Sequence, residues 1–262
     1  MTPRPFSSRG HTLLEMTIAL ALGLLIVLAS LSLYRGQRAA FDRAADAARI
    51  HDAASNALDM LGQQIQMAGF PSSGEPAVDV PIVGCAQSRV VGADTTASCE
   101  SLASRSDGLQ VRHAADSVST WPSSSGMPTD CLGQAVADAI VTNRLYAKAS
   151  SSTGEPELYC EGSGRQAQPI VEGIERLRVM YWLTGSSSAS DASAISRERW
   201  RDAYAADVCI VVRGFATHAK RRTSYIDCNG SPAYAEDGRV RQVFWRRVAI
   251  RNSPAMASGG AQ

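Results

Sequence analysis

The stretch that decides the fold is residues 11–34, which read HTLLEMTIALALGLLIVLASLSLY. Residues 13–34 are almost wholly apolar, and Glu15 is the only charged side chain among them. An α-helix rises about 1.5 Å per residue and the hydrocarbon core of a bilayer is about 30 Å thick, so this segment is long enough to cross a membrane. The sequence therefore predicts a membrane-spanning helix near the N-terminus.

The helical pattern continues beyond the apolar segment. Spacings of three and four residues, which are typical of an amphipathic helix, connect Phe41, Ala44, Ala48, His51, Ala54, Leu58, Leu61, Ile65 and Ala68. No proline occurs between Pro5 and Pro71. We therefore expect one continuous helix from about residue 12 to residue 68, about 85 Å long, with Gly69 at its C-terminal cap and Pro71 just beyond.

After Pro71 the composition shifts to Ser, Gly, Val, Thr and scattered aromatic residues, a pattern typical of short strands and turns. The expected strands are 77–83, 108–113, 139–147, 157–160, 177–183, 207–215, 223–227 and 240–250. The Ser-rich stretches 117–126 and 185–196 are expected to be surface loops. The predicted fold class is α+β: a long N-terminal helix, half transmembrane and half amphipathic, packed on a β-rich, disulfide-bearing head at 69–252, with a flexible tail at 253–262.

Charge and cysteine content restrict the class of protein. The 262 residues include 26 Lys and Arg and 25 Asp and Glu, a formal charge of +1. Residues 1–10 hold two of the arginines and no acid, so the remainder is nearly neutral, which argues against a general nucleic-acid binder. All six cysteines follow the apolar segment, as expected for a head in an oxidising compartment.

Six cysteines allow fifteen complete pairings, so the sequence alone leaves the connectivity open. Cys209 and Cys228 would face each other in a hairpin of 207–215 with 223–227, in which Val211 would oppose Ile226. Cys85 similarly mirrors Cys99 about Gly92. Cys131 and Cys160 remain as the third pair, without support from hairpin symmetry.

The junction between leader and helix, Arg9-Gly10-His11-Thr12-Leu13-Leu14-Glu15, resembles the class III signal of type IV prepilins and type II secretion pseudopilins. The resemblance implies a leader at 1–10 that prepilin peptidase removes after Gly10, and an N-methylated His11 as the mature N-terminus. Glu15 then stands at mature position five. The family usually has Phe where this chain has His11.

The chemistry of Glu15 supports this interpretation. A carboxylate within an apolar membrane helix costs about 2.5 to 3.5 kcal/mol on insertion scales. Cleavage after Gly10 creates an α-amino group about one helical turn from Glu15, and in a filament the amine of one subunit can meet the Glu15 of its neighbour. Glu15 is therefore predicted to set the register of assembly.

Two simpler interpretations compete with a prepilin. One is an ordinary secretory signal, with Arg4 and Arg9 before an apolar region at 16–28 and cleavage after Ala29. The other is a plain single-span anchor. Both leave Glu15 unexplained, and the secretory signal does not account for the helical pattern that continues to Ala68.

Short motifs in the head resemble PilW-type minor pilins of type IV pilus assembly. They are QMAGF at 66–70, SDGLQV at 106–111, LYC at 158–160, VEGIE at 171–175 and VAIRN at 248–252. The resemblance implies a structural, priming subunit at or near the pilus tip. Its partners would be major and minor pilins, met through the N-terminal helix. It would be anchored in the bacterial inner membrane with a periplasmic head, then carried to the cell surface in the pilus. A J-class pseudopilin of type II secretion is the alternative.

No residue pattern points to an enzyme. Gly-x-Ser-x-Gly, P-loop and dinucleotide-binding motifs do not occur in the sequence, and neither does a Cys-x-x-Cys metal knuckle. No catalytic residue, metal site or cofactor is therefore predicted. His113 is expected to be a structural histidine within a strand, and Glu155 and Glu157 to be solvated loop charges.

A basic, aromatic stretch near the C-terminus leaves one binding function open. It comprises Arg239, Arg241, Phe244, Trp245, Arg246, Arg247 and Arg251, with 220–222 upstream. Interleaved arginine and aromatic residues can hold DNA strands, which makes a membrane-anchored module that binds DNA or a surface ligand the second hypothesis. The favoured interpretation is a strand whose inward residues are Val240, Phe244, Val248 and Ile250.

Overall fold

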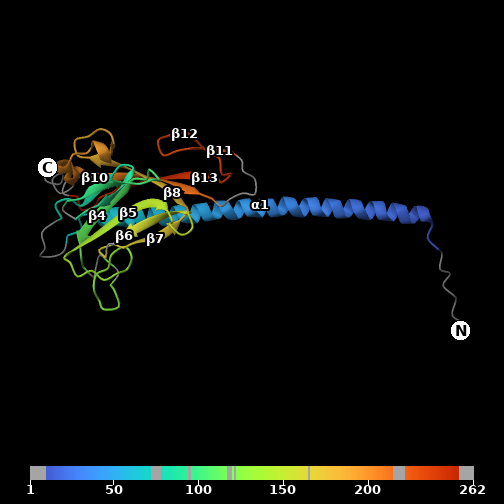
Figure 1. Ribbon diagram of the computed structural model, residues 1–262, viewed down its shortest axis with the longest axis horizontal. Helices are drawn as coiled ribbons and strands as arrows, with labels where there is room; N and C mark the ends of the chain where they lie inside the picture. The colour runs from blue at the N-terminus through green and yellow to red at the C-terminus, as the bar shows by residue number, and fades with distance from the viewer. Residues whose placement is uncertain are drawn as a thin grey trace. The chain divides into compact units, whose positions relative to one another are not determined.

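The computed structural model describes residues 10–71, 78–93, 96–116, 120, 122–164, 166–214 and 222–253 (Figure 1). The chain divides into two compact units, Met1–Ala48 and Arg49–Gln262. One helix, α1 (Leu13–Met67), begins in the first unit and ends in the second. The predicted leader lies outside the described residues except for Gly10, and the predicted tail lies outside them except for Ser253.

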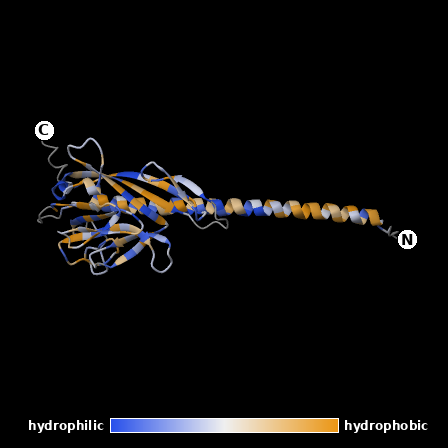
Figure 2. Cartoon of the chain, turned by 45° about the horizontal axis from the view of Figure 1, so that its top comes forward, coloured by the Kyte–Doolittle hydropathy of each residue, from blue (hydrophilic) through white to orange (hydrophobic). Residues whose placement is uncertain are grey.

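Within the first unit, residues 13–34 of α1 are apolar and exposed. Their large apolar side chains range from Leu13, 83 % exposed, to Leu31, 48 % exposed. Figure 2 shows the apolar colour running along this part of the helix. By length and composition α1 can cross a membrane. The long apolar helix predicted from the sequence is therefore confirmed.

Glycine ends the helix as predicted. Gly69 adopts φ +76°, the left-handed conformation of a helix cap, and its N–H donates to the carbonyl of Arg112 at 2.9 Å. A Cβ at this position would lie 2.6 Å from the carbonyl oxygen of Asn252. Both the backbone conformation and the crowding therefore require glycine.

The apolar face of α1, predicted from residues at spacings of three and four, is buried from Ala54 onward. Ala54, Leu58, Leu61, Ile65 and Ala68 are at most 6 % exposed. Upstream of Ala54 the prediction was partly wrong, because Ile50 is buried at 2 % exposure and the neighbouring His51 is exposed. The His51 ring instead makes an edge contact with Phe244, with ring centroids 5.3 Å apart.

A five-stranded antiparallel sheet forms one half of the head. Its strand order is β1-β4-β5-β6-β7. The strands are β1 (Ile82–Cys85), β4 (Gly108–Ala114), β5 (Ile140–Ala149), β6 (Pro156–Glu161) and β7 (Ala167–Glu172). A separate hairpin of β2 (Ser88–Val91) and β3 (Ser98–Ser101) lies close to this sheet, since a Cβ on Gly108 would fall 2.7 Å from the carbonyl oxygen of Ser88.

A four-stranded antiparallel sheet forms the other half, in the order β13-β10-β8-β9. The strands are β8 (Ile174–Leu183), β9 (Ser190–Asp191), β10 (Ala203–Arg213) and β13 (Arg241–Ala249). Two 3-10 helices, η1 (Ala192–Ala194) and η2 (Arg197–Asp202), connect β9 to β10. A second hairpin joins β11 (Thr223–Ile226) to β12 (Pro232–Ala235).

One hydrophobic core joins the two sheets to α1. Leu61 and Ile65 of the helix meet Leu109 and Leu145 of the five-stranded sheet and Ile210 of the four-stranded sheet in a single cluster of fully buried side chains. The strands of both sheets gather around the C-terminal part of the helix (Figure 1). The predicted α+β class, with the helix packed on a β-rich head, is confirmed.

Several local predictions were wrong. The stretch 185–196 contains β9 and η1 rather than only loop, and the prediction missed β2, β3, β7 and β12. The predicted strand at 77–83 begins only at Ile82, and residue 77 lies outside the described residues. Part of the predicted loop at 117–126 also lies outside them. Val240 is 39 % exposed, so it does not face the core with Phe244, Val248 and Ile250.

Candidate functional site: the start of the long helix and the arginines of the last strand

The start of α1 carries the residues that the prepilin signal singles out. Gly10 and His11 are exposed and precede the helix, which begins at Leu13. A Cβ on Gly10 would meet nothing within 4 Å. The folded chain does not itself require glycine at this position, so any requirement must come from outside the fold.

Thr12 and Glu15 form a reciprocal cap on the first turn of α1. The Thr12 N–H donates to Glu15 Oε2 at 2.9 Å, and the Thr12 hydroxyl donates to the same oxygen at 3.2 Å. In return, the Glu15 N–H donates to Thr12 Oγ1 at 3.3 Å. This is a capping box, whose sequence signature is Thr-x-x-Glu. The sequence reasoning missed it because Glu15 was considered only as an unpaired charge.

The other polar side chains of the apolar segment are satisfied within the helix. The hydroxyls of Thr17, Ser30 and Ser32 donate to backbone carbonyls three or four residues earlier, at 2.8 to 2.9 Å. In a bilayer core a polar group without a hydrogen-bond partner costs several kcal/mol. These hydroxyls therefore impose little penalty on membrane insertion, and Glu15 is the one charged group in the segment.

The six cysteines form three disulfides in the head, Cys85–Cys99, Cys131–Cys160 and Cys209–Cys228. Their Cα–Cα distances are 5.6, 6.4 and 5.9 Å, within the ordinary range. These are the pairs that the sequence analysis favoured. The geometric reasons given for two of them were nevertheless wrong.

The predicted hairpin of 207–215 with 223–227 does not form. Strand β10 pairs with β8 and β13, whereas β11 pairs with β12. Val211 opposes Val243 and Arg176, and Ile226 opposes Pro232. Cys228 follows β11 and is bonded to Cys209 on the central strand β10, where Tyr225 and Val243 pack around the bridge. This disulfide fastens a peripheral hairpin to the sheet.

The Cys85–Cys99 bridge also fastens a peripheral hairpin. Cys99 pairs across the β2–β3 hairpin with Val90, not with Cys85. Cys85 belongs to β1 and opposes Gly108 of β4. The predicted mirror symmetry about Gly92 is therefore wrong, although the disulfide forms.

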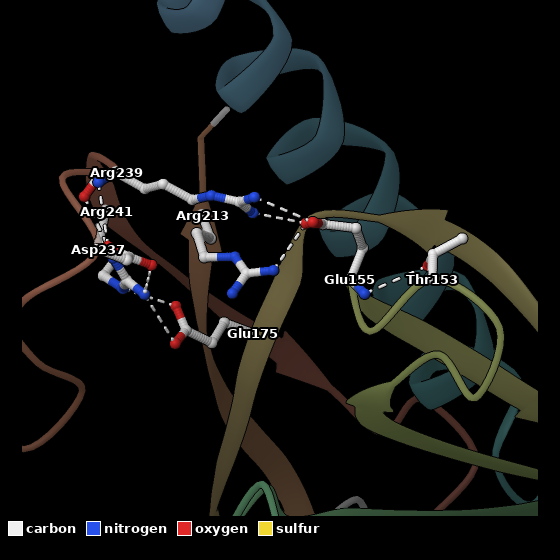
Figure 3. Close-up of polar contacts among 7 residues, drawn as sticks. All are labelled: Thr153, Glu155, Glu175, Arg213, Asp237, Arg239 and Arg241. Carbon is white, nitrogen blue, oxygen red and sulfur yellow. Dashed lines mark hydrogen bonds and ion pairs between the residues drawn. The ribbon is translucent and has the colours of Figure 1, made fainter. Parts of the chain in front are cut away.

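A cluster of ion pairs connects the two sheets near the beginning of β13 (Figure 3). Glu155, in the β5–β6 turn, receives two hydrogen bonds from Arg239 at 2.6 and 3.0 Å and one from Arg213 at 2.7 Å. These arginines lower the pKa of Glu155. Glu155 is an exposed loop residue, as predicted, but its carboxylate is ion-paired. Glu157 is not a solvated loop charge, because it lies in β6, is buried and accepts a hydrogen bond from Tyr159.

Arg241 forms the second part of this cluster. Its guanidinium contacts Glu175 at 2.7 Å and Asp237 at 2.7 Å (Figure 3). The guanidinium holds the pKa of Asp237 well below its usual range. The side chain of Arg241 is only 6 % exposed, so this pair is better shielded from solvent than most surface ion pairs.

Three further arginines of the basic stretch and its upstream segment are also matched with acids. Arg246 bonds to Asp59 of α1, and Arg247 bonds to Asp207 at 2.6 Å while stacking on Trp182 at 4.4 Å. Arg222 pairs with Glu236 at 3.3 Å. Residues 220 and 221 lie outside the described residues. This pairing neutralises the charge that a DNA backbone would require, so it weakens the DNA-binding interpretation.

The described residues contain no group of three or more His, Cys, Asp or Glu side chains that could hold a metal ion. His113 is 2 % exposed, and its Nδ1 lies 3.0 Å from the carbonyl oxygen of Ala114. Burial lowers the pKa of His113. The neutral ring is therefore a structural part of strand β4.

Comparison with known proteins supports a pilin. Residues 145–252, less than half of the chain, match the family model PilW, Type IV Pilus-assembly protein W. This match covers β6 to β13 and the cluster of ion pairs around Glu155 and Arg241. No curated protein is significantly similar in sequence.

Among solved structures, the type IV-like pilin TTHA1219 from Thermus thermophilus is similar at 12 % sequence identity and a TM-score of 0.43. The similarity covers 78 % of this chain and 98 % of that one. The family resemblance therefore rests on the sequence match to PilW. We conclude that the head matches the PilW family of type IV pilus assembly over residues 145–252, which supports a pilin-like protein related to the type IV pilus.

Proposed function

We propose that this chain is a minor pilin, a structural and priming subunit of the type IV pilus placed at or near the tip. The observation that carries this proposal is the position of Glu15, which is the one charge in the exposed apolar segment 13–34 of a chain that continues into a PilW-like head. A carboxylate in the bilayer core costs about 2.5 to 3.5 kcal/mol, more than the roughly 1 kcal/mol that a helix cap contributes to an ordinary anchor.

The proposal includes processing and anchoring. Prepilin peptidase cuts after Gly10, and His11 becomes an N-methylated N-terminus. Residues 13–34 hold the chain in the inner membrane while the head folds in the periplasm, an oxidising compartment in which three disulfides can form. After assembly the subunit is part of the pilus at the cell surface.

Glu15 acts in assembly through its neighbour's amine. Thr12 holds the Glu15 carboxylate at the beginning of the helix by two hydrogen bonds to one oxygen, Oε2. A charged amine from the adjacent subunit can bind the carboxylate when the helices pack. Before the helices pack, neither the carboxylate nor the amine has an opposite charge beside it in the membrane. After packing the two charges form a pair, so the axial position in which they meet is favoured over others.

The experiment is a Glu15→Ala substitution in the full chain, with Thr17→Ala as the matched control two residues further along the same apolar segment. We expect Glu15→Ala to insert into membranes normally and to fail in restoring pili to a strain that lacks the protein. Thr17→Ala should restore them. Normal piliation with Glu15→Ala would contradict the proposed role of the carboxylate.

A further inference from the structure

The first charged residues beyond the apolar segment are both basic. Arg35 directly follows Tyr34, the last residue of the segment, and Arg38 lies three residues further along α1. The next charged residue is Asp42, so the charge between residues 35 and 41 is entirely positive. Side chains three residues apart lie on the same side of a helix. Arg35 and Arg38 therefore form one small basic patch.

This basic patch has no partner in the chain itself. Arg35 and Arg38 are both exposed, and neither bonds to another residue within the described part of the chain. The arginines of β13 differ, because Arg241, Arg246 and Arg247 are each bonded to a carboxylate. The guanidiniums of the basic patch are therefore free to bind a negatively charged group outside the chain.

The length of the apolar segment places the basic patch at the depth of lipid headgroups. Residues 13–34 extend for about 33 Å, close to the hydrocarbon core of about 30 Å, and each headgroup layer adds roughly 5 to 7 Å. Along the helix axis Arg35 and Arg38 lie about 1.5 and 6 Å beyond Tyr34, within this layer. Arg43 lies about 13.5 Å beyond Tyr34, which is outside it.

The direction of the helix turns both side chains toward the bilayer. Side chains of an α-helix lean toward its N-terminus, and here the apolar segment is on the N-terminal side of Arg35 and Arg38. In the proposed orientation the patch lies on the periplasmic side, where basic residues are disfavoured. A guanidinium that binds phosphate oxygens through two parallel N–H donors offsets this cost.

We propose that Arg35 and Arg38 bind the phosphate of an anionic phospholipid in the leaflet on the side of the head. This inference rests on the membrane anchoring in the proposed function. The contact fixes the depth of the apolar segment, because a shift of the helix in either direction moves the guanidiniums into hydrocarbon or away from the phosphates.

Spin-labelled lipids test this contact in the full chain, reconstituted into phosphatidylcholine bilayers. Electron spin resonance compares the association of spin-labelled phosphatidylglycerol and spin-labelled phosphatidylcholine with the chain. We expect the parent chain to prefer phosphatidylglycerol. An arginine near an anionic surface contributes about fivefold to association, so Arg35→Gln and Arg38→Gln should each lower the preference and the double variant should lose it. Equal association of both lipids with the parent chain would overturn the proposal.

Arg43→Gln is the charge-matched control for Arg35→Gln. Arg43 is also exposed on α1, but it lies about 12 Å beyond Arg35 along the helix, further than the Debye length of about 8 Å at physiological ionic strength. Arg43→Gln should therefore keep the preference for phosphatidylglycerol. A loss as large as that of Arg35→Gln would contradict a contact at the headgroups. Glutamine is a good helix former, so both variants should keep the helix, which circular dichroism measures.

Inorganic phosphate distinguishes a lipid headgroup from the free anion. Phosphate and chloride buffers of equal ionic strength screen charges alike, so the preference for phosphatidylglycerol should be the same in both. A preference that disappears only in phosphate would identify a site for the free anion and overturn the lipid contact.

Protease treatment of the same vesicles separates failure of this inference from failure of the proposed anchoring. A protected peptide that contains residues 13–34 shows insertion. An inserted chain without a lipid preference would overturn the phospholipid contact alone, whereas a chain that does not insert would overturn the anchoring as well.

Discussion

The N–H of Thr12 donates to the carboxylate of Glu15 at 2.9 Å, which caps the first turn of the long helix with the one charged side chain of its apolar segment 13–34. This contact bears on the free energy of inserting the Glu15 carboxylate into a membrane. The carboxylate already has donors in the single chain, so its insertion into lipid does not require an amine partner from the outset. The amine of a neighbouring subunit adds charge neutralisation, which the uncharged donors of Thr12 do not supply.

Removing the Thr12 side chain should weaken the first helical turn. We expect Thr12→Ala to cost about 1 kcal/mol, and to speed amide exchange at Glu15 about fivefold, because Oγ1 of Thr12 accepts the Glu15 N–H. Hydrogen exchange of the full chain in detergent measures this change. Thr12→Ser keeps the hydroxyl and should behave like the parent, and unchanged exchange in Thr12→Ala would contradict the capping role.

Gly69→Ala should destabilise the head through crowding as well as backbone strain. Left-handed strain costs about 1 kcal/mol or more, and the added Cβ would lie 2.6 Å from the Asn252 carbonyl oxygen. Gly126→Ala is the matched control, because Gly126 also has φ +76° but nothing lies within 4 Å of its Cβ position. Urea unfolding should give the larger loss for Gly69→Ala. Equal losses would show that crowding at Asn252 contributes nothing.

Removal of the Cys209–Cys228 bridge should release one hairpin and spare the core. We expect a double Cys→Ser variant to lose about 3 kcal/mol of stability, with increased hydrogen exchange in β11 and β12. The amides of Leu177 and Ile210 should stay protected, because both residues belong to the main core. The control variant lacks Cys85–Cys99 instead and should keep β11 and β12 protected. Loss of amide protection throughout the head would contradict the prediction that the bridge stabilises only the β11–β12 hairpin.

The ion pair between Arg241 and Asp237 should make stability depend on acid pH. The pKa of Asp237 is lower in the folded chain than its ordinary value of about 3.9. The carboxylate therefore stabilises the fold fully above that pH and loses this effect as the pH falls below it, toward the folded pKa. Asp237→Asn should flatten the dependence of unfolding free energy on pH in this acid range. Glu236→Gln, an exposed partner of Arg222, should leave the slope unchanged.

The helix, its cap and the head's fold class were predictable because each depends on local pattern. Leu58, Leu61 and Ile65 follow helical spacing, and Gly69 with Pro71 marks the end. The short hairpins were not predictable in this way. Strand β3 is exposed throughout, so it has no apolar alternation, and β12 contains Pro232 and two alanines rather than β-branched residues.

The pairing of strands that are far apart in the sequence could not be predicted either. The spacing of Cys209 and Cys228 in the sequence fits a simple hairpin. In the structure, however, β10 is a central strand, and the strands that pair with it, β8 and β13, come before and after it in the chain. Tertiary packing, rather than the local sequence, determines which strands pair with β10 and in which register. Glu155 shows the same limit, since its partners Arg213 and Arg239 are 58 and 84 residues away. The Thr12–Glu15 cap, by contrast, has a visible Thr-x-x-Glu signature and could have been predicted.

Mass spectrometry of the N-terminus of the chain purified from its own membrane tests the central claim most directly. We expect a polypeptide that begins at His11 and carries a methyl group on its α-amine, with residues 1–10 removed. A mature chain that begins at Ser30, as after an ordinary signal peptide, or one that retains Met1 to Gly10 in full would contradict it.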